Sequence, residues 1–333
     1  MRAEELSRGL RALGWDARVA VPATFRNKEV GRTRAVEPFY FDASQFTFFG
    51  ELRRLIRSFD PLFVHFLNPK EKALAIALML RRVKYVLDWE DWSTFWKAST
   101  VVKAYEDLRS DVLIRRAGLV VTASRWLGEY IHNRFGCQTL YLPYACLPRS
   151  FPDPRDDSDG SVVVGMGNLY SSWDHDLFVE AMGELKRRGV ESRACWIGDG
   201  EDMERTRRRV EALGLTRFEL PGYLDWDLML RQLREAYCLV FPIRRNLLNS
   251  ARCPFKCFQF AQSGRPVITS DVGEVRSILG DLATYVEPTA EGYAEGIERC
   301  LSAGRQGDLQ YDLASHRWDL RAMDLARALE GVS

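Results

Sequence analysis

The stretch Cys253–Val275, CPFKCFQFAQSGRPVITSDVGEV, decides the fold. Pro254 suits the first position of a helix and Gly264 suits its C-terminal end, so the first half of the stretch predicts a helix. The apolar run Pro266–Thr269 follows directly and predicts a buried strand, and the apolar run Leu239–Phe241 predicts another strand before the helix. Strand, helix and strand in this order are typical of a parallel sheet with helices on its faces.

The same alternation continues in both directions along the chain. In Glu51–Phe59, apolar residues recur at the i, i+3, i+4 and i+7 spacing of an amphipathic helix. The other segments with strand character are short and apolar: Arg18–Val21, Leu62–Phe66, Tyr85–Leu87, Leu119–Thr122, Thr139–Leu142, Val162–Gly165, Arg193–Ile197, Phe218–Leu220 and Thr284–Val286. We therefore predict an α/β protein with doubly wound, Rossmann-like sheets.

The alternation is broken at Pro148–Gly160, PRSFPDPRDDSDG. Its prolines and aspartates lack any hydrophobic period and predict an exposed linker. We therefore predict an N-terminal Rossmann-like domain over residues 1–150 and a C-terminal one over residues 151–333, which face each other across a cleft. Ligands bind to such sheets at the carboxyl ends of the strands.

The start of the first domain departs from this pattern. Met1–Leu13 reads directly as a helix that ends at Gly14, whereas a doubly wound domain normally opens with a strand and a tight loop. Either the first strand is missing from the chain or the start of the chain is internal. In both cases we expect an N-terminal domain that is incomplete at its start, with an exposed sheet edge.

Composition narrows the classes of function. Lys and Arg number 47 and Asp and Glu 46, and a net charge of +1 gives no reason to expect a nucleic-acid partner. The longest apolar run, Leu74–Leu80, is far shorter than the roughly 20 residues of a membrane span, and the charged N-terminus is unlike a signal peptide. Seven cysteines without a CxxC pair favour buried, reduced thiols over disulfides or a zinc site. We expect a cytoplasmic protein without a metal.

Five segments in order resemble a known family. They are VVVGMGN (162–168), ACWIGDGED (194–202), FELPGYL (218–224), AYCLVFPI (236–243) and the stretch 253–275. The chain resembles the GT-B-fold glycosyltransferases of family 4, strongly over Val162–Val275 and more loosely before Arg116. The resemblance implies a retaining enzyme that moves a sugar from a nucleotide-diphosphate donor to a polysaccharide, glycolipid or lipid-linked acceptor of the cell envelope. We expect no cofactor, since the nucleotide sugar is a substrate, and no metal, since no carboxylates cluster with His in the sequence.

Two cations at the predicted helix are the first candidates for the donor site. Arg252 and Lys256 lie about one turn apart beside the free N–H groups of the helix start, a combination that suits a diphosphate. Ordinary solvated cations would give the same pattern. Family members commonly carry two glutamates here, and the matching positions hold Ala251 and Gln259. The resemblance assigns the ribose hydroxyls to Gln259, whose amide can donate and accept hydrogen bonds.

A second departure from the family lies in the loop Gly167–Asp174, GNLYSSWD. This loop lacks the Arg and Lys that usually neutralise the leaving diphosphate. We expect Arg252 and Lys256 to supply the charge, together with Arg244 or Arg245, since no metal is evident.

The resemblance places the remaining donor contacts in three loops that follow strands. Glycine at the end of a strand lets a phosphate approach the backbone closely, although a plain turn has the same composition. The residues concerned are Gly167, Asn168, Gly198, Asp199, Tyr223 and Leu224.

In the first domain, Val86–Trp92, VLDWEDW, ends a strand at the expected cleft. Family members often have His-Asp where this chain has Glu90 and Asp91. These carboxylates would orient the acceptor hydroxyl or assist proton transfer, and a plain surface loop is the alternative. His65 ends another strand and is either a cleft residue or a structural one.

Three alternatives stay open. An aromatic and basic surface could touch the inner face of the plasma membrane, or it could be a helix packing inward with solvated arginines; its residues are Phe46, Phe48, Phe49, Arg53, Arg54 and Arg57. A degenerate, non-catalytic protein that binds nucleotide sugars is favoured by the missing strand, the vacant glutamate position and the cation-free loop. A nucleotide-sugar 2-epimerase would share the fold.

Overall fold

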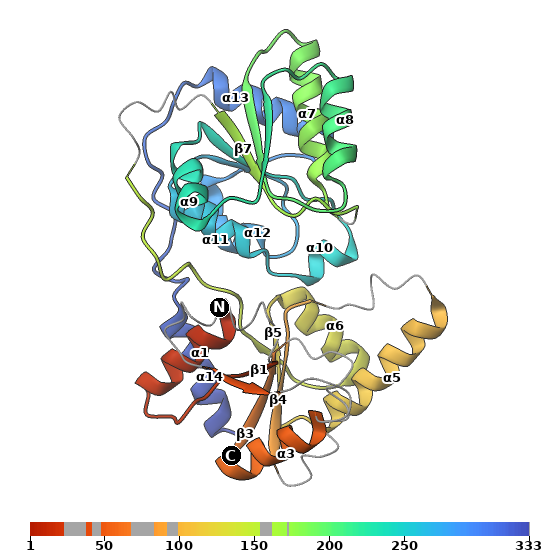
Figure 1. Cartoon of the computed structure of the whole chain (residues 1–333), viewed down its shortest axis with the longest axis vertical. Helices are drawn as coiled ribbons and strands as arrows, with labels where there is room; N and C mark the ends of the chain where they lie inside the picture. The colour runs from red at the N-terminus through yellow and green to blue at the C-terminus, as the bar shows by residue number, and fades with distance from the viewer. Residues whose placement is uncertain are drawn as a thin grey trace. The chain divides into compact units, whose positions relative to one another are not determined.

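A computed structural model describes residues 1–22, 38–41, 48–67, 83–91, 99–153, 162–171 and 173–332 (Figure 1). Helices alternate with parallel strands in two compact units, which confirms the predicted α/β class. The first unit comprises Met1–Ala145, Ala251–Cys253 and Arg317–Ser333, and the second comprises Cys146–Ser250 and Pro254–His316. Part of the predicted linker, residues 154–160, lies outside the described residues, as do Leu74–Leu80 and Phe46.

The second unit contains a six-stranded parallel sheet. Its strands are β7 (Val162–Met166), β8 (Arg193–Ile197), β9 (Phe218–Gly222), β10 (Cys238–Phe241), β11 (Val267–Thr269) and β12 (Thr284–Tyr285). The order across the sheet is β12-β11-β10-β7-β8-β9. Numbered from β7, this is the doubly wound order 3-2-1-4-5-6, in which the direction of winding reverses between β7 and β10. The carboxyl ends of these two strands therefore mark the place where such a sheet binds ligands.

This unit also contains seven α-helices in its described part. They are α7 (His175–Arg187), α8 (Met203–Ala212), α9 (Trp226–Glu235), α10 (Leu247–Ala251), α11 (Phe255–Ser263), α12 (Val275–Leu279) and α13 (Ala290–Ser302). Ala251, at the end of the short helix α10, is assigned to the first unit. Phe178 of α7, Trp196 of β8 and Tyr293 of α13 belong to one buried core. At α11, Gly264 is the left-handed C-cap, as predicted. Pro254 is the N-cap of this helix, whereas the sequence predicts it as the first helical residue, one position later.

The first unit contains two parallel sheets in its described part. β3 (Phe63–Leu67), β4 (Lys84–Trp89), β5 (Leu119–Thr122) and β6 (Leu140–Tyr141) form one sheet in that order. β1 (Ala20–Pro22) pairs with β2 (Phe39–Phe41), a short strand that the sequence analysis missed. Among the described residues no strand joins β1 to β3. In the doubly wound order a further strand would lie at that position.

The two ends of the chain pack together within the first unit. Figure 1 shows α1 (Arg2–Ala12) beside α14 (Trp318–Glu330), and Leu6 and Leu325 share a buried core there. A Cβ on Gly9 would overlap the side chain of Ala322, so the helices approach closely. The predicted ranges 1–150 and 151–333 therefore differ from the observed units. The sequence of an amphipathic helix indicates that one face is buried, but it does not indicate in which domain. The pattern of α14 therefore could not show that this helix packs in the first unit.

The remaining helices of the first unit are α3 (Phe48–Phe59), α5 (Thr100–Arg116) and α6 (Arg125–Phe135). The predicted helix 51–59 lies inside α3. Within the described residues, no helix combines the length and the apolar character needed to cross a bilayer. All seven cysteines are free thiols and five of them are buried, as expected.

Candidate functional site

In the second unit, the loops that follow β7 and β8 interlock at the carboxyl end of the sheet. Gly167 donates its N–H to the carbonyl of Ile197 (2.9 Å), and Leu169 donates to the carbonyl of Asp199 (3.0 Å). Gly198 has a φ of +141°, and a Cβ on it would overlap the carbonyl of Gly167. Only glycine fits there, because the two backbones leave no room for a side chain.

The loop after β9 joins the first two through Tyr223. Its hydroxyl lies 3.2 Å from Oδ1 of Asn168 and 3.3 Å from the carbonyl oxygen of Asp199, while 65% of the residue stays exposed. The structure thus brings together Gly167, Asn168, Gly198, Asp199 and Tyr223, which we name the three-loop cluster. Leu224 follows Tyr223 and is half-buried, and its donor contact stays a prediction.

A buried tryptophan supports the three-loop cluster from beneath. Nε1 of Trp196 donates to the carbonyl of Gly167 (2.9 Å), and only 3% of Trp196 is exposed. This bond fixes the orientation of the peptide that follows Gly167. Sequence reasoning missed this role of Trp196, which lies two residues before Gly198 at the end of β8.

Lys256 extends from the first turn of α11 to the end of β7. A Cβ on Gly167 would overlap its Nζ atom, so the ammonium group lies against the bare backbone of that glycine. The ammonium group also lies 4.9 Å from the ring centre of Trp173 and 5.5 Å from that of Phe241. A cation from the helix therefore stands beside the loop that carries none of its own.

Arg244 has a different role from the one we expected. Its guanidinium donates to Asp174 (3.0 Å) and, with two nitrogens, to Asp176 (2.7 Å each). The hydrogen bonds from Arg244 and its charge lower the pKa of Asp176, although burial alone would raise it. Arg245 lies 3.7 Å from Glu287 in an exposed pair. Arg244 therefore anchors the loop after β7, because carboxylates occupy the donors that a phosphate would need.

Arg252 and Gln259 lie on either side of Lys256 in sequence. Arg252 is in the turn between α10 and α11, is 8% exposed and belongs to the first unit, whereas Lys256 belongs to the second. Their joint action on one diphosphate stays a prediction. Gln259 lies about one turn after Lys256 and is 4% exposed, and its amide has no hydrogen-bond partner among the described residues. Ala251, at the vacant glutamate position, is buried.

The first unit holds a buried charged cluster at the end of β4. Arg2 donates two hydrogen bonds of 2.9 Å to Asp88, and Nε2 of His65 lies 3.1 Å from the same carboxylate. Asp88 is fully buried and Arg2 is 4% exposed. Burial alone would raise the pKa of Asp88, but the charges of Arg2 and His65 hold it below its ordinary value. The structural interpretation of His65 is therefore favoured.

Glu90 lies beside this cluster. The hydroxyl of Tyr144 donates to Glu90, and the Arg2 guanidinium carbon lies 5.3 Å from the centre of the Tyr144 ring. Burial raises the pKa of Glu90 against the opposing effects of Tyr144 and Arg2, and neighbouring Asp91 raises it further. Asp91 is half-buried. Sequence reasoning missed Arg2, Asp88 and Tyr144 as partners of the predicted carboxylates.

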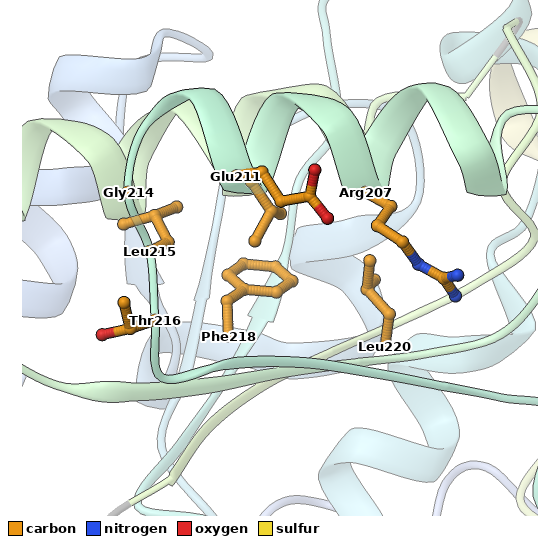
Figure 2. A pocket seen from close by; sticks show the side chains of 8 residues that line it. Arg207, Glu211, Gly214, Leu215, Thr216, Phe218 and Leu220 are labelled. Carbon is orange, nitrogen blue, oxygen red and sulfur yellow. The ribbon is translucent and has the colours of Figure 1, made fainter.

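A hollow in the described part of the second unit lies away from these loops. Figure 2 shows Phe218 and Leu220 of β9 pointing toward α8, with Arg207 at one end of the hollow. None of its lining residues belongs to the three-loop cluster. Its floor is made of apolar side chains at the edge of the sheet and Arg207 is the cation in its lining, so it lies apart from the strand-ending loops where such a sheet binds ligands. Among the described residues, no cluster of His, Cys, Asp and Glu suits a metal ion.

Solved structures with this fold include several glycosyltransferases. Anabaena Alr3699/HepE in complex with UDP-glucose has 14% identity and a TM-score of 0.75, over 99% of this chain and 96% of that chain. Sucrose-phosphate synthase from Thermosynechococcus elongatus has 16% identity and a TM-score of 0.67, over 98% and 87%. A glycosyltransferase from Rickettsia africae has 14% identity and a TM-score of 0.66, over 99% and 92%. A search of curated proteins finds no match.

Family models match both halves of the sequence. A glycosyl transferase 4-like domain matches residues 1–144, and a glycosyl transferases group 1 domain matches residues 160–303. One match falls mainly on each of the two units, and together they cover well over half of the chain. The chain belongs to the GT-B glycosyltransferases, with a glycosyl transferase 4-like domain followed by a group 1 domain.

Proposed function

We propose that this glycosyltransferase binds a nucleotide-diphosphate sugar at the three-loop cluster, with Lys256 against the diphosphate. The observation that carries the proposal is the position of the Lys256 ammonium group at Gly167, beside the end of β7. Loops at this end of a doubly wound sheet are where nucleotides bind, and strand-ending glycines allow phosphates to approach the backbone. The neighbour HepE was solved with UDP-glucose, so UDP-glucose is the first donor to test.

The amide of Gln259 suits a second donor contact. It lies on α11 about one turn after Lys256 and makes no hydrogen bond within the described part of the chain. An amide offers one acceptor and two hydrogens, which suits the two hydroxyls of a ribose. We assign Gln259 to the ribose, Leu224 to the loop beside the base and Arg252 to the diphosphate as a second cation.

The reaction we propose retains the configuration of the sugar. The bond between the anomeric carbon and the diphosphate breaks, and the diphosphate leaves with the electron pair. The acceptor hydroxyl forms the new bond on the same face and gives up its proton, to the leaving oxygen or to a carboxylate. Lys256 stabilises the charge that grows on the leaving oxygen. We assign Glu90 and Asp91 to the acceptor, because burial raises the pKa of Glu90 and a carboxylate with a raised pKa is a stronger base.

No metal takes part in this mechanism, and the acceptor is a polysaccharide, a glycolipid or a lipid-linked precursor. A lipid-linked acceptor would bring the enzyme to the inner face of the plasma membrane as a peripheral protein. The exposed arginines Arg53, Arg54 and Arg57 of α3 suit such a surface.

The proposal is tested by incubating the protein with UDP-, GDP-, ADP- and dTDP-sugars, with and without candidate acceptors. We expect one donor class to release free nucleotide diphosphate, faster with acceptor and equally in excess EDTA. Proton NMR of the product should show the anomeric configuration of the donor. Inversion, or a requirement for magnesium, would contradict the mechanism. Binding without release would favour the non-catalytic alternative, and a donor changed only at C2 would favour the epimerase.

A further inference from the structure

We propose that Trp173 is a positioning residue that holds the Lys256 ammonium group at the place where the donor diphosphate binds. The inference rests on the proposed function and adds a residue for which neither the sequence analysis nor the family gives a role. Trp173 belongs to the loop after β7, the loop that lacks its own cations. That loop thus contributes an aromatic ring in place of a charge.

The geometry is that of a cation held against aromatic rings. Nζ of Lys256 lies 4.9 Å from the ring centre of Trp173, within the range of about 6 Å over which a ring face attracts a cation. Phe241, at the end of β10, lies 5.5 Å from the same atom. The glycine backbone at Gly167 provides a further contact. A long lysine side chain has many rotamers, so these contacts narrow the volume that its ammonium group samples.

An aromatic ring differs from a carboxylate in what it does to the charge. A ring face attracts a cation through its quadrupole and brings no formal negative charge. Asp174 and Asp176, by contrast, occupy the donors of Arg244 and neutralise it. Trp173 can therefore restrict the position of the Lys256 ammonium group without itself neutralising the positive charge.

Trp173 is itself held in place on both sides. Its backbone N–H donates to the carbonyl of Tyr170 (2.9 Å). The next residue, Asp174, is 7% exposed and accepts hydrogen bonds from the backbone of Arg244 (3.0 Å) and from Nδ2 of Asn249 (2.8 Å). The ion pair of Arg244 adds a third bond to the same carboxylate. The anchor at Asp174 thus sets the position of the ring, and the ring sets that of the ammonium group.

The test compares Trp173→Leu, Trp173→Phe and the control Trp226→Leu in the full chain. Trp226 begins α9, is 46% exposed and lies outside the three-loop cluster. Calorimetry gives the Kd of each protein for UDP and for uridine, which lacks the diphosphate. We expect Trp173→Leu to weaken UDP about fivefold to tenfold and to leave uridine nearly unchanged. The kcat with UDP-glucose should fall further than the affinity, and Trp173→Phe should restore most of both.

A purely structural role of Trp173 gives a different result. It would weaken UDP and uridine equally, lower the melting temperature, and give no preferential rescue by phenylalanine. In a Lys256→Met background, Trp173→Leu should have almost no further effect on UDP, since the two residues act through one ammonium group. Additive losses would overturn the inference. If the wild type binds UDP and the ratio of the two Kd values, for UDP and for uridine, is unchanged in Trp173→Leu, only the role of Trp173 is overturned. Absence of nucleotide binding by the wild type overturns the proposed function and this inference together.

Discussion

The three-loop cluster of the second unit and the charged cluster of the first unit are built on opposite principles. Backbone contacts at Gly167 and Gly198 hold the first together, and Tyr223 stays 65% exposed. Buried charges hold the second together, and Asp88 is fully enclosed by its partners. In a ligand site, the groups that bind the ligand must stay available, so other contacts have to hold the site together. The charged groups of the first unit pair with one another. We therefore regard the buried pair of Arg2 and Asp88 as a structural support for Glu90 and Asp91, and we name this pair the frame.

The largest effect should come from the frame. Arg2→Met leaves Asp88 charged and buried, and breaking a buried pair in this way costs about 3–5 kcal/mol of unfolding free energy. Arg11→Met is the matched control on the same helix, because Arg11 is exposed, bonds the carbonyl of Ala17 and should matter by no more than about 0.5 kcal/mol. Urea unfolding at pH 7 measures both. Equal stability of the two variants would mean that the charged cluster is not a frame.

Lys256→Ala should affect function more than stability. A hydrogen bond from a cation to a phosphate contributes about 1.5–3 kcal/mol, so donor affinity should fall roughly tenfold or more. The loss in kcat should be larger, since charge on the leaving oxygen grows in the transition state. The control is Lys186→Ala, whose ammonium group bonds the carbonyl of Gly214 at the surface. Unchanged Kd and kcat in Lys256→Ala would leave Lys256 as a structural cation.

Gly198→Ala tests whether the second cluster depends on backbone contact. The new Cβ overlaps the carbonyl of Gly167 and the residue sits at a φ that disfavours a side chain, which together cost about 1–3 kcal/mol. Donor binding should fall with stability because two of the three loops separate. Gly307→Ala has open space around its Cβ and serves as the control. Calorimetric melting with and without UDP checks this, and a Gly198→Ala protein that melts and binds like wild type contradicts it.

The smallest effect concerns the pH dependence of Glu90. Its pKa is raised by burial in the folded state, so its contribution to stability is full below about pH 4.3, the unfolded value, and is lost as pH rises through the folded value. Glu90→Gln should therefore gain stability relative to wild type between pH 4 and 7. Asp88, with a lowered pKa, contributes above its unfolded value and loses that contribution as pH falls. Asp88→Asn should show the opposite slope, and parallel slopes in urea unfolding would contradict both assignments.

The comparison also shows what the sequence could reveal. The alternation of apolar runs and amphipathic segments predicted the strands β3 to β12, because burial on both faces of a parallel sheet imposes a continuous apolar run. The strand β2 was missed although Phe39–Phe41 is wholly aromatic. Two of its three residues are exposed, so it lacks the pattern of a strand buried on both faces. The packing of α14 on α1 is a contact between the two ends of the chain, and no local pattern encodes it.

The sequence predicted some site residues and missed others, because a local pattern does not encode contacts between distant segments. The glycines of the three loops follow their strands directly, so their meeting at one sheet edge follows from the parallel topology. Arg2 was missed although it lies on the same helix face as Leu6 and Leu10, where a charge must find a buried partner. Asp88 gave a similar signal as an acid inside the apolar strand β4. The contact between Lys256 and Trp173 joins a helix to a distant loop, and sequence spacing carries no trace of it.

The most direct test of the account is hydrogen exchange of the backbone amides in the wild-type protein with and without UDP. We predict that UDP slows exchange in the three-loop cluster, at residues 167–171, 198–201 and 222–224, and in the first turn of α11. The hollow at Phe218 and Leu220 and the charged cluster around Asp88 should exchange as before. Protection at the hollow, or no protection in the three-loop cluster at a UDP concentration that saturates the protein, would contradict the central claim.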